Sequence, residues 1–341
     1  MTNTAKQITI VSYGAGVDST AVLVGMYKRG ERPDRILFAN TGGEKPETYH
    51  YLFGVMQPWL AEIGFPAVEV AQYTPEKFVN EPYSTLQGNC ISNSTMPSIA
   101  FGGKGCSQKW KAQPLDRYVD SLPEVKAAYK RGEQVVRVIG YDAGPKDARR
   151  GNEKDTAKYS WRFPLRQWGW DRERCEAEIR NAGLPVPMKS ACWFCPVNKP
   201  EEVRWLMENH PELAMGIIEI ERRVAPVQAA QKAKGLWGRG TKGLRKGVEA
   251  KPARMTEYLA SLGFEPAKRV DFAAIEESAL KALVAMGDVP MPVREAKREF
   301  VDFILDDYAD EMFDCSSILD SVEPEVEGSL LVALLDERAA A

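Results

Sequence analysis

Histidine is nearly absent from this chain of 341 residues, and cysteine is uncommon. The two histidines, His50 and His210, are too few for a histidine-built zinc hydrolase, and they argue against a Ser-His-Asp triad. Six cysteines are too few for a disulfide scaffold, so a Cys-x-x-Cys pair here indicates metal or redox chemistry. The opening MTNTAKQITIVSYG has neither a long apolar run nor a small-residue cleavage site. We therefore expect a cytoplasmic protein without a membrane anchor.

Neither sign of charge is in large excess. Lysine and arginine together number 45 against 48 aspartates and glutamates, which gives a formal net charge of -3. This balance excludes a protein that binds polyanions with its whole surface. Hydrophobic residues at 44% and charged residues at 27% are typical of a folded chain with a full core. Any contact with nucleic acid therefore has to come from a local basic patch.

Short apolar stretches alternate with helical patterns near the start of the chain. Residues 6–13, 35–42 and 65–73 are β-branched or apolar enough for buried strands, and residues 18–29 and 46–64 between them have helical spacing. This alternation predicts an α/β fold in which a parallel sheet is covered by helices on both faces. Such sheets bind ligands at the carboxyl ends of their strands, so the loops after the first two strands should line the site.

The remaining sequence divides into further segments. Residues 79–108 are rich in glycine, serine, asparagine and proline and are too long for a plain connection, which indicates a functional loop. Residues 133–142 have the pattern of another core strand. Residues 231–251 hold seven basic residues and one acidic residue. We therefore predict a first domain with the binding motifs (1–225), a basic glycine-rich linker (226–252) and an acidic helical C-terminal region (253–341).

A glycine turn joins the first expected strand to the first expected helix. Gly14 and Gly16 let the backbone approach a ligand, and the amides that open the helix point at it with the positive end of the helix dipole. The turn suits phosphate, although a plain strand-to-helix turn capped by Asp18 is the alternative. It is neither a Walker A loop nor GxGxxG, because no Gly-Lys-Ser/Thr follows and Ser19 stands at the third glycine. The expected nucleotide contacts in this segment are Ser12, Tyr13, Gly14, Ala15, Gly16, Asp18, Ser19 and Thr20.

The same turn resembles the PP-loop, the SGGxDS turn that binds pyrophosphate in the adenine nucleotide alpha-hydrolase superfamily. Gly14 and Ala15 replace one serine and one glycine of that motif. Residues 38–48 are similar to the NTGxExPET stretch of the phosphoadenosine phosphosulfate (PAPS) reductase-like branch. The resemblance implies a HUP-type fold that binds ATP or PAPS together with Mg²⁺. It adds Asn40, Thr41, Gly42 and Glu44 to the expected nucleotide contacts, with Glu44 placed on Mg²⁺, on ribose or as the cap of the following helix.

A cysteine pattern follows the long loop. Cys106 is followed 86 residues later by Cys192, which forms a Cys-x-x-Cys pair with Cys195. The iron–sulfur sulfonucleotide reductases show a similar pattern, with a Cys-Cys pair, a lysine and Pro-Leu before a distant Cys-x-x-Cys. In that alignment Lys111 matches the lysine and Ser107 replaces the second cysteine of the pair. Thiolates select zinc or an iron–sulfur centre, so we expect a [4Fe-4S] cluster, with Zn²⁺ as the alternative.

The fourth metal ligand has to come from another part of the chain. We prefer Cys175, because the helix expected at 171–182 leads into the Cys-x-x-Cys pair and can fold back beside it. Cys90 in the long loop is the reserve. Two other interpretations stay open, with Cys175 as a small buried apolar residue and the Cys-x-x-Cys as a dithiol redox pair. The expected metal ligands are Cys106, Cys175, Cys192 and Cys195.

Basic and aromatic side chains complete the candidate site. Arg149 follows the strand expected at 133–142, where it could clamp phosphate or sulfate oxygens, although a solvated surface charge is the alternative. The resemblance to the sulfonucleotide reductases adds Lys111 to the expected catalytic residues. Trp161 belongs to a tryptophan cluster that could stack on a base, with core packing as the alternative. The expected catalytic residues are Asp18, Lys111 and Arg149.

Three functions are compatible with these features. The first, an ATP pyrophosphatase that adenylates a nucleic acid or small molecule for thiolation, is implied by resemblance to DNA phosphorothioation and tRNA thiolation enzymes and needs a sulfur donor such as a cysteine desulfurase. The second is a PAPS or APS reductase, although the reductive Glu-Cys-Gly-Leu-His segment of that family is missing. The third is a non-catalytic nucleotide sensor in a defence or mobile-element system. Residues 231–251 could contact nucleic acid, and the sequence is compatible with a homodimer.

Overall fold

The computed structural model describes residues 7–80, 82–97, 105–145, 147, 154–230 and 254–261. Arg149, the basic segment 231–251 and nearly all of the C-terminal region predicted at 253–341 lie outside these residues. In the described part of the chain, no helix is both long enough and apolar enough to cross a bilayer.

Five parallel strands form the central sheet, in the order β3-β2-β1-β4-β5. The predicted α/β fold with a parallel sheet is confirmed. β5 was not predicted from the sequence, because it is only four residues long and its side chains are all only half-buried. The strands are β1 (Thr9–Ser12), β2 (Arg35–Asn40), β3 (Val68–Gln72), β4 (Val135–Ile139) and β5 (Tyr159–Arg162).

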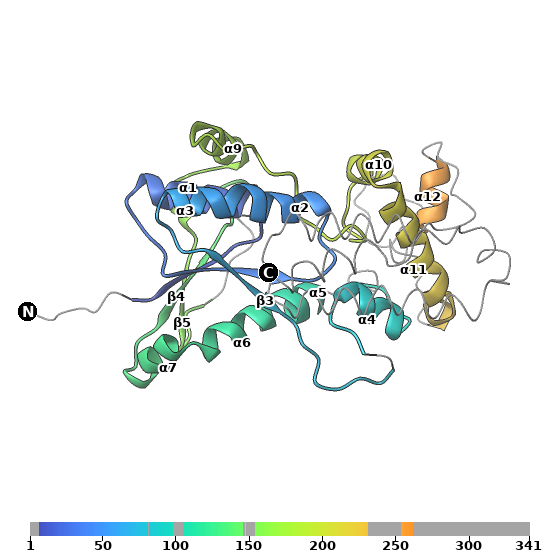
Figure 1. The fold of residues 1–341 in the computed structure, drawn as a ribbon, viewed down its shortest axis with the longest axis horizontal. Helices are drawn as coiled ribbons and strands as arrows, with labels where there is room; N and C mark the ends of the chain where they lie inside the picture. Colours follow the sequence, from blue (N-terminus) through green and yellow to red (C-terminus); the bar gives the residue numbers. More distant parts are fainter. Residues whose placement is uncertain are drawn as a thin grey trace, which may run out of the picture.

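Helices cover both faces of this sheet (Figure 1). One face is covered by α1 (Val17–Lys28), by the helical run α2 (Pro46–His50), η1 (Tyr51–Met56) and α3 (Gln57–Glu62), and by α8 (Pro164–Gln167) and α9 (Arg172–Asn181). The other face is covered by α6 (Gln113–Ser121) and α7 (Pro123–Lys130). The run from α2 to α3 begins at Pro46 and ends at Gly64 with a φ of 72°, as the sequence predicted.

A third group of helices lies beyond one end of the sheet (Figure 1). It consists of α4 (Leu86–Ser92), α5 (Gly105–Ser107), η3 (Gln108–Ala112), α10 (Pro200–Asn209), α11 (Pro211–Ala230) and α12 (Met255–Ser261). α4 and α5 lie inside the stretch 79–108, so part of the functional loop predicted there is helical. α11 continues through Ala230, so residues 226–230 are helical and the linker predicted at 226–252 does not begin at 226.

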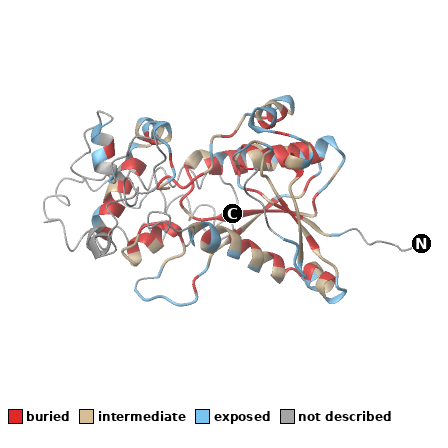
Figure 2. Cartoon of the chain, turned by 180° about the vertical axis from the view of Figure 1, so that it is seen from behind, coloured by how far each residue is buried: buried red, intermediate tan, exposed pale blue. Residues whose placement is uncertain are grey.

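Three apolar clusters hold these layers together, and Figure 2 shows the buried positions concentrated along the sheet and the inner faces of the helices. The first cluster packs α1, α3 and α9 on one face of the sheet, and the second packs α6 and α7 on the other. The third joins α4, η3, α10 and α11 to the segment that carries Cys192. β2 and β3 are added on one side of β1, and the later strands β4 and β5 are added on its other side. The sheet therefore has a switch point between β1 and β4, which is where such sheets bind ligands.

Candidate functional site

A cavity of about 1080 Å³ opens at the switch point between β1 and β4. Six of the expected nucleotide contacts line it. They are Ser12, Tyr13, Gly14, Gly16, Asp18 and Ser19. The predicted catalytic residue Lys111 and the aromatic Trp161 line it as well. The structure therefore brings the glycine turn, Lys111 and Trp161 to one concave site of the size that a nucleotide requires.

The glycine turn has a conformation suited to an anion. Ala15 has a φ of 53°, in the left-handed region, although it is not a glycine. Gly16 is the N-cap of α1, and no described side chain caps that helix, so its first amides stay available. Ser19 braces the turn, because its Oγ accepts from the Gly14 amide at 3.2 Å and donates to the Gly16 carbonyl at 3.1 Å.

Gly140, directly after β4, lets the second side of the switch point approach this turn. A Cβ at Gly140 would lie 2.9 Å from the carbonyl group of Asp18 and from the amide nitrogen of Ser19. Contacts that short do not occur between a real Cβ and backbone atoms, so only glycine permits this packing. The position of the helix start therefore depends on a residue at the end of another strand.

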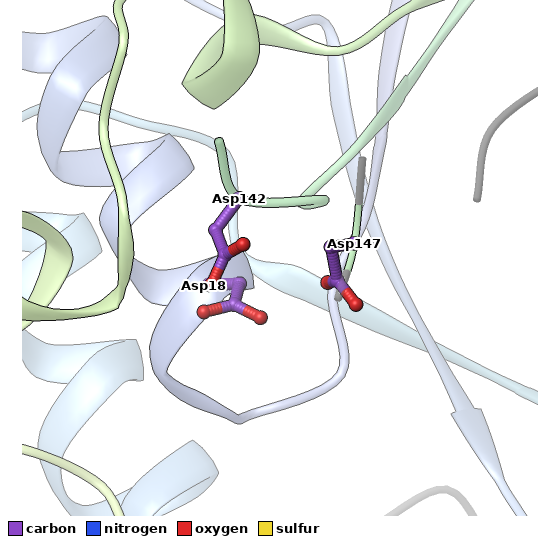
Figure 3. A group of neighbouring side chains, drawn as sticks. All are labelled: Asp18, Asp142 and Asp147. Atoms are coloured by element: carbon purple, nitrogen blue, oxygen red, sulfur yellow. The ribbon is translucent and has the colours of Figure 1, made fainter. Parts of the chain in front are cut away.

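Three carboxylates converge at the mouth of the cavity. Asp18, Asp142 and Asp147 each offer an oxygen within 4.8 Å of the others, and Figure 3 shows the three side chains gathered from the start of α1 and from the segment after β4. All three line the cavity. Carboxylate oxygens are the ligands that Mg²⁺ prefers, so this donor set fits the magnesium ion that the family resemblance implies.

An arginine lies beside one of these carboxylates. Arg172 at the start of α9 lies 3.2 Å from the carboxylate of Asp18. Burial raises the pKa of Asp18 above its usual value of 3.8, the Arg172 charge opposes this shift, and the charges of Asp142 and Asp147 add to it. A divalent cation at this place would relieve the repulsion among the three carboxylates.

The remaining expected nucleotide contacts do not line the cavity. Ala15 and Thr20 are buried in the packing of the turn. Asn40 holds the end of β2 instead, where its Oδ1 accepts from the Tyr49 hydroxyl at 2.7 Å and from the Gly42 amide at 2.9 Å. Thr41, Gly42 and Glu44 face the third apolar cluster and its cysteines.

Four cysteines gather in that third cluster. Cys90 on α4 and Cys192 are buried in it, and Cys106 and Cys195 pack against it half-buried. Burial raises the pKa of the Cys90 thiol, and the charges of Cys106 and Cys192 add to the shift. Four thiolate ligands in one apolar pocket fit an iron–sulfur cluster or zinc. We call Cys90, Cys106, Cys192 and Cys195 the cysteine quartet.

Cys175, the preferred fourth ligand, is not in this quartet, so that assignment needs correction. It lies on α9 in the first apolar cluster, fully buried beside Trp170. Burial raises the pKa of its thiol to about 12, and the charges of Asp18 and Asp142 add to the shift. Its neighbours are thus the carboxylates of the cavity. The short connection in sequence suggested that α9 folds back onto the Cys-x-x-Cys pair, whereas α9 packs along α1.

Lys111 connects the cavity to the quartet. Its ammonium donates to the buried carboxylate of Glu44 at 2.8 Å. Burial lowers the pKa of Lys111, but the charges of Glu44 and Cys192 more than offset it, and the net shift is upward. Glu44 in turn pairs with Cys192 in an isolated antiparallel bridge. Glu44 therefore lies between Lys111 and Cys192, and it does not line the cavity.

Sequence reasoning missed several residues that line the cavity. Asp142 and Asp147 follow β4, and Arg172, Lys189 and Lys199 come from later segments. The Gly-Tyr-Asp that ends the segment 133–142 was a signal for Asp142, since a polar residue at a strand end of a parallel sheet faces the ligand site. No local pattern marked the lysines, which reach the cavity through tertiary packing.

Comparisons with known proteins return little. No family model matches the chain. No curated protein matches it either. Among solved structures it is similar to the U34-tRNA thiolase NcsA from Methanococcus maripaludis with its [4Fe-4S] cluster, at 14% identity over 76% of this chain and 84% of that chain, with a TM-score of 0.34. A score this low does not establish a shared fold, and the function has to be inferred from the residues of this chain.

Proposed function

We propose that the protein is an ATP-using enzyme of the PP-loop type. It cleaves ATP between the α- and β-phosphates and adenylates a substrate, which prepares that substrate to receive sulfur. The observation that carries the proposal is the cavity between β1 and β4, where a glycine turn, an uncapped helix start and three clustered carboxylates meet. A nucleoside triphosphate with a divalent cation is the ligand whose charges match this combination.

The glycine turn supports binding of the β- and γ-phosphates. The free amides at the start of α1 point into the cavity mouth, where they can donate to phosphate oxygens. Arg172 lies across the same opening and adds a planar cationic group with several donors. Together these groups stabilise the negative charge that develops on pyrophosphate as it leaves.

Asp18, Asp142 and Asp147 would hold the metal ion that accompanies the triphosphate. Bound Mg²⁺ supplies neutralisation of charge on the phosphate oxygens that it contacts. The three side chains come from two loops that meet at the switch point, so the site forms only when the sheet is assembled.

Apolar lining residues of the cavity support binding of the adenine base. Phe38, Leu115 and Trp161 supply them. Arg137 on β4 also lines the cavity, and its Nη1 donates to Asp116 at 2.8 Å. A planar base can pack against such side chains while the phosphates extend toward the glycine turn.

The cysteine quartet supports the sulfur-transfer step. Loaded with iron and sulfide, the quartet would hold an iron–sulfur centre beside the nucleotide cavity. Lys111 lines the nucleotide cavity and also contacts Glu44 beside Cys192, so the two sites share a wall. A cysteine desulfurase is the class of donor that would supply the sulfur, and the acceptor is a nucleic acid or a small molecule.

The test compares products from two nucleotides. Full-length protein is prepared anaerobically and incubated with Mg²⁺ and either ATP or PAPS. We expect AMP and pyrophosphate from ATP and no sulfite from PAPS. Sulfite release would identify a sulfonucleotide reductase, and tight ATP binding without any turnover in acceptor mixtures would identify a sensor. Either result would overturn the proposal, and Asp142→Asn serves as the control for background hydrolysis.

A further inference from the structure

The position of α4 determines whether Cys90 can serve as the fourth metal ligand. Cys90 is on α4 and has no exposed surface. The amide of Leu86, at the start of this helix, donates to the Thr41 carbonyl at 2.8 Å. The start of α4 is therefore hydrogen-bonded to the turn that follows β2.

The same turn holds the Cys-x-x-Cys segment. The hydroxyl of Thr41 lies 3.3 Å from the sulfur of Cys192. The amide of Trp193 donates to the Gly43 carbonyl at 2.9 Å, and a Cβ at Gly43 would lie 2.5 Å from the ring of Phe194. One short turn thus fixes both Cys90 and Cys192, although they are 102 residues apart in sequence.

The third component of the quartet comes from the segment before α6. Cys106 on α5 packs against the same apolar cluster as Cys90, while its neighbour Ser107 is exposed to solvent. In the resemblance to the iron–sulfur reductases, Ser107 stands where the second cysteine of a pair is expected. The chain therefore lacks a ligand at that position and places another buried cysteine nearby.

We propose that Cys90 replaces the missing cysteine, so that Cys90, Cys106, Cys192 and Cys195 together ligate a [4Fe-4S] cluster and Cys175 takes no part. This inference extends the proposed function, and it rests on that function only for the role of the cluster. The ligand set itself is independent of nucleotide chemistry. Four sulfur ligands saturate the four irons of such a cluster.

The sulfur atoms of the quartet are not placed for a single zinc ion. A single Zn²⁺ with sulfur ligands at about 2.3 Å needs sulfurs about 3.8 Å apart in a tetrahedron. Among the described residues, the group of three or more ligand atoms within 4.8 Å of one another is the aspartate group and contains no cysteine. In every trio from the quartet, at least one pair of sulfurs is thus farther apart than one zinc ion requires.

Cys90→Ser and Cys175→Ser form a matched pair, because both cysteines are fully buried in apolar clusters. Each full-length variant is purified anaerobically, and iron, zinc, acid-labile sulfide and absorbance near about 400 nm are measured. We expect about four irons and four sulfides per chain in the wild type and in Cys175→Ser. Cys90→Ser should lose at least about half of the iron and the spectrum of the intact cluster. Iron loss in Cys175→Ser with none in Cys90→Ser would overturn the proposal, as would one zinc per chain.

A measurement on the wild type covers the case in which Cys90→Ser does not fold. Mild oxidation releases iron from a cluster that lacks one cysteine ligand and leaves a paramagnetic three-iron centre. With four cysteine ligands we expect no such signal by electron paramagnetic resonance, and its appearance would overturn the assignment. ATP binding to Cys90→Ser is measured by calorimetry in parallel. Because metal content needs no nucleotide, a failure of the ATP site and a failure of the ligand assignment give different results.

Discussion

The ammonium group of Lys111 lies 2.8 Å from the carboxylate of Glu44, at the wall between the nucleotide cavity and the cysteine quartet. The Glu44 side chain is only 1% exposed, whereas that of Lys111 is 42% exposed. The second oxygen of the carboxylate is buried without a hydrogen-bond partner in the described structure. Glu44 thus depends on Lys111 for compensation of its charge.

Removal of the lysine charge should destabilise the fold through Glu44. We expect Lys111→Met to lower the free energy of unfolding by about 2 kcal/mol, below the usual cost for a fully buried pair because solvent reaches the lysine. Lys111→Met combined with Glu44→Gln should recover much of this loss, because no buried charge is left unpaired. Urea denaturation of the wild type, Lys111→Met, Glu44→Gln and the double variant measures both effects. Equal stability of Lys111→Met and the wild type would contradict this account of the pair.

We expect the Asp142 carboxylate to destabilise the protein without Mg²⁺ and to stabilise it when Mg²⁺ and ATP are bound. Without Mg²⁺, Asp142→Asn removes one of three close negative charges, so we expect its melting temperature to equal or exceed that of the wild type. With Mg²⁺ and ATP, the wild type should gain more, and the affinity of the variant for Mg²⁺-ATP should fall about tenfold, or about 1.4 kcal/mol. Thermal melts and calorimetry measure the two effects. Glu62→Gln, an exposed position on α3, is the control, and identical behaviour of both variants would count against a metal site.

The raised pKa of Asp18 predicts how cation binding depends on pH. Burial and the charges of Asp142 and Asp147 raise this pKa above 3.8 in the folded protein, so the folded state holds this proton more tightly than the unfolded chain. The stability contributed by the proton is present at low pH and is lost as pH rises through the folded pKa. Mg²⁺ needs the ionised carboxylate, so Mg²⁺ affinity should fall as pH drops toward that raised value. Titration with Mg²⁺ at several pH values measures this, and an affinity that increases on acidification would refute the assignment.

Gly140 should be intolerant of any side chain because of its contact with the start of α1. We expect Gly140→Ala to cost about 1–3 kcal/mol in the free energy of unfolding, because its Cβ would have to displace backbone atoms. The shift of the helix start should weaken ATP binding at least about tenfold, or about 1.4 kcal/mol. Gly14→Ala is the matched control for folding, since its Cβ would meet only the Ser19 hydroxyl, at 3.9 Å. Equal stability of the two variants would show that β4 and the turn are not tightly packed.

Local sequence was sufficient to predict the first unit of the fold. The strand before Gly14, the glycine turn and the helix after it follow from patterns within about 20 residues, because strand, turn and helix propensities act over such distances. β5 was not predicted, since its four half-buried residues are too short a pattern to mark a strand, and it forms by pairing with β4. Register with a neighbouring strand supplies what its own residues do not specify.

The residues of the candidate site also divide into those that local sequence predicted and those that only tertiary packing brings together. Asp18 and Ser19 were identified because the turn that carries them is contiguous in sequence. Asp147 and Arg172 were not, because only the meeting of β4, α1 and α9 brings them to the cavity. Cys175 was chosen over Cys90 on proximity in sequence, and the structure places Cys90 with the other cysteines of the quartet.

The amino-acid sequence by itself determined the parallel α/β sheet, the phosphate-type turn at Gly14–Ser19 and the presence of a cysteine set, since each follows from residue types at short spacing. Tertiary structure alone decided which side chains share a site. A turn at Thr41–Glu44 holds two cysteines that are distant in sequence, and the reversal of strand order at β1 brings three aspartates to one point. Such contacts depend on the packing of whole helices and strands, and that packing is not encoded in any short stretch of the chain.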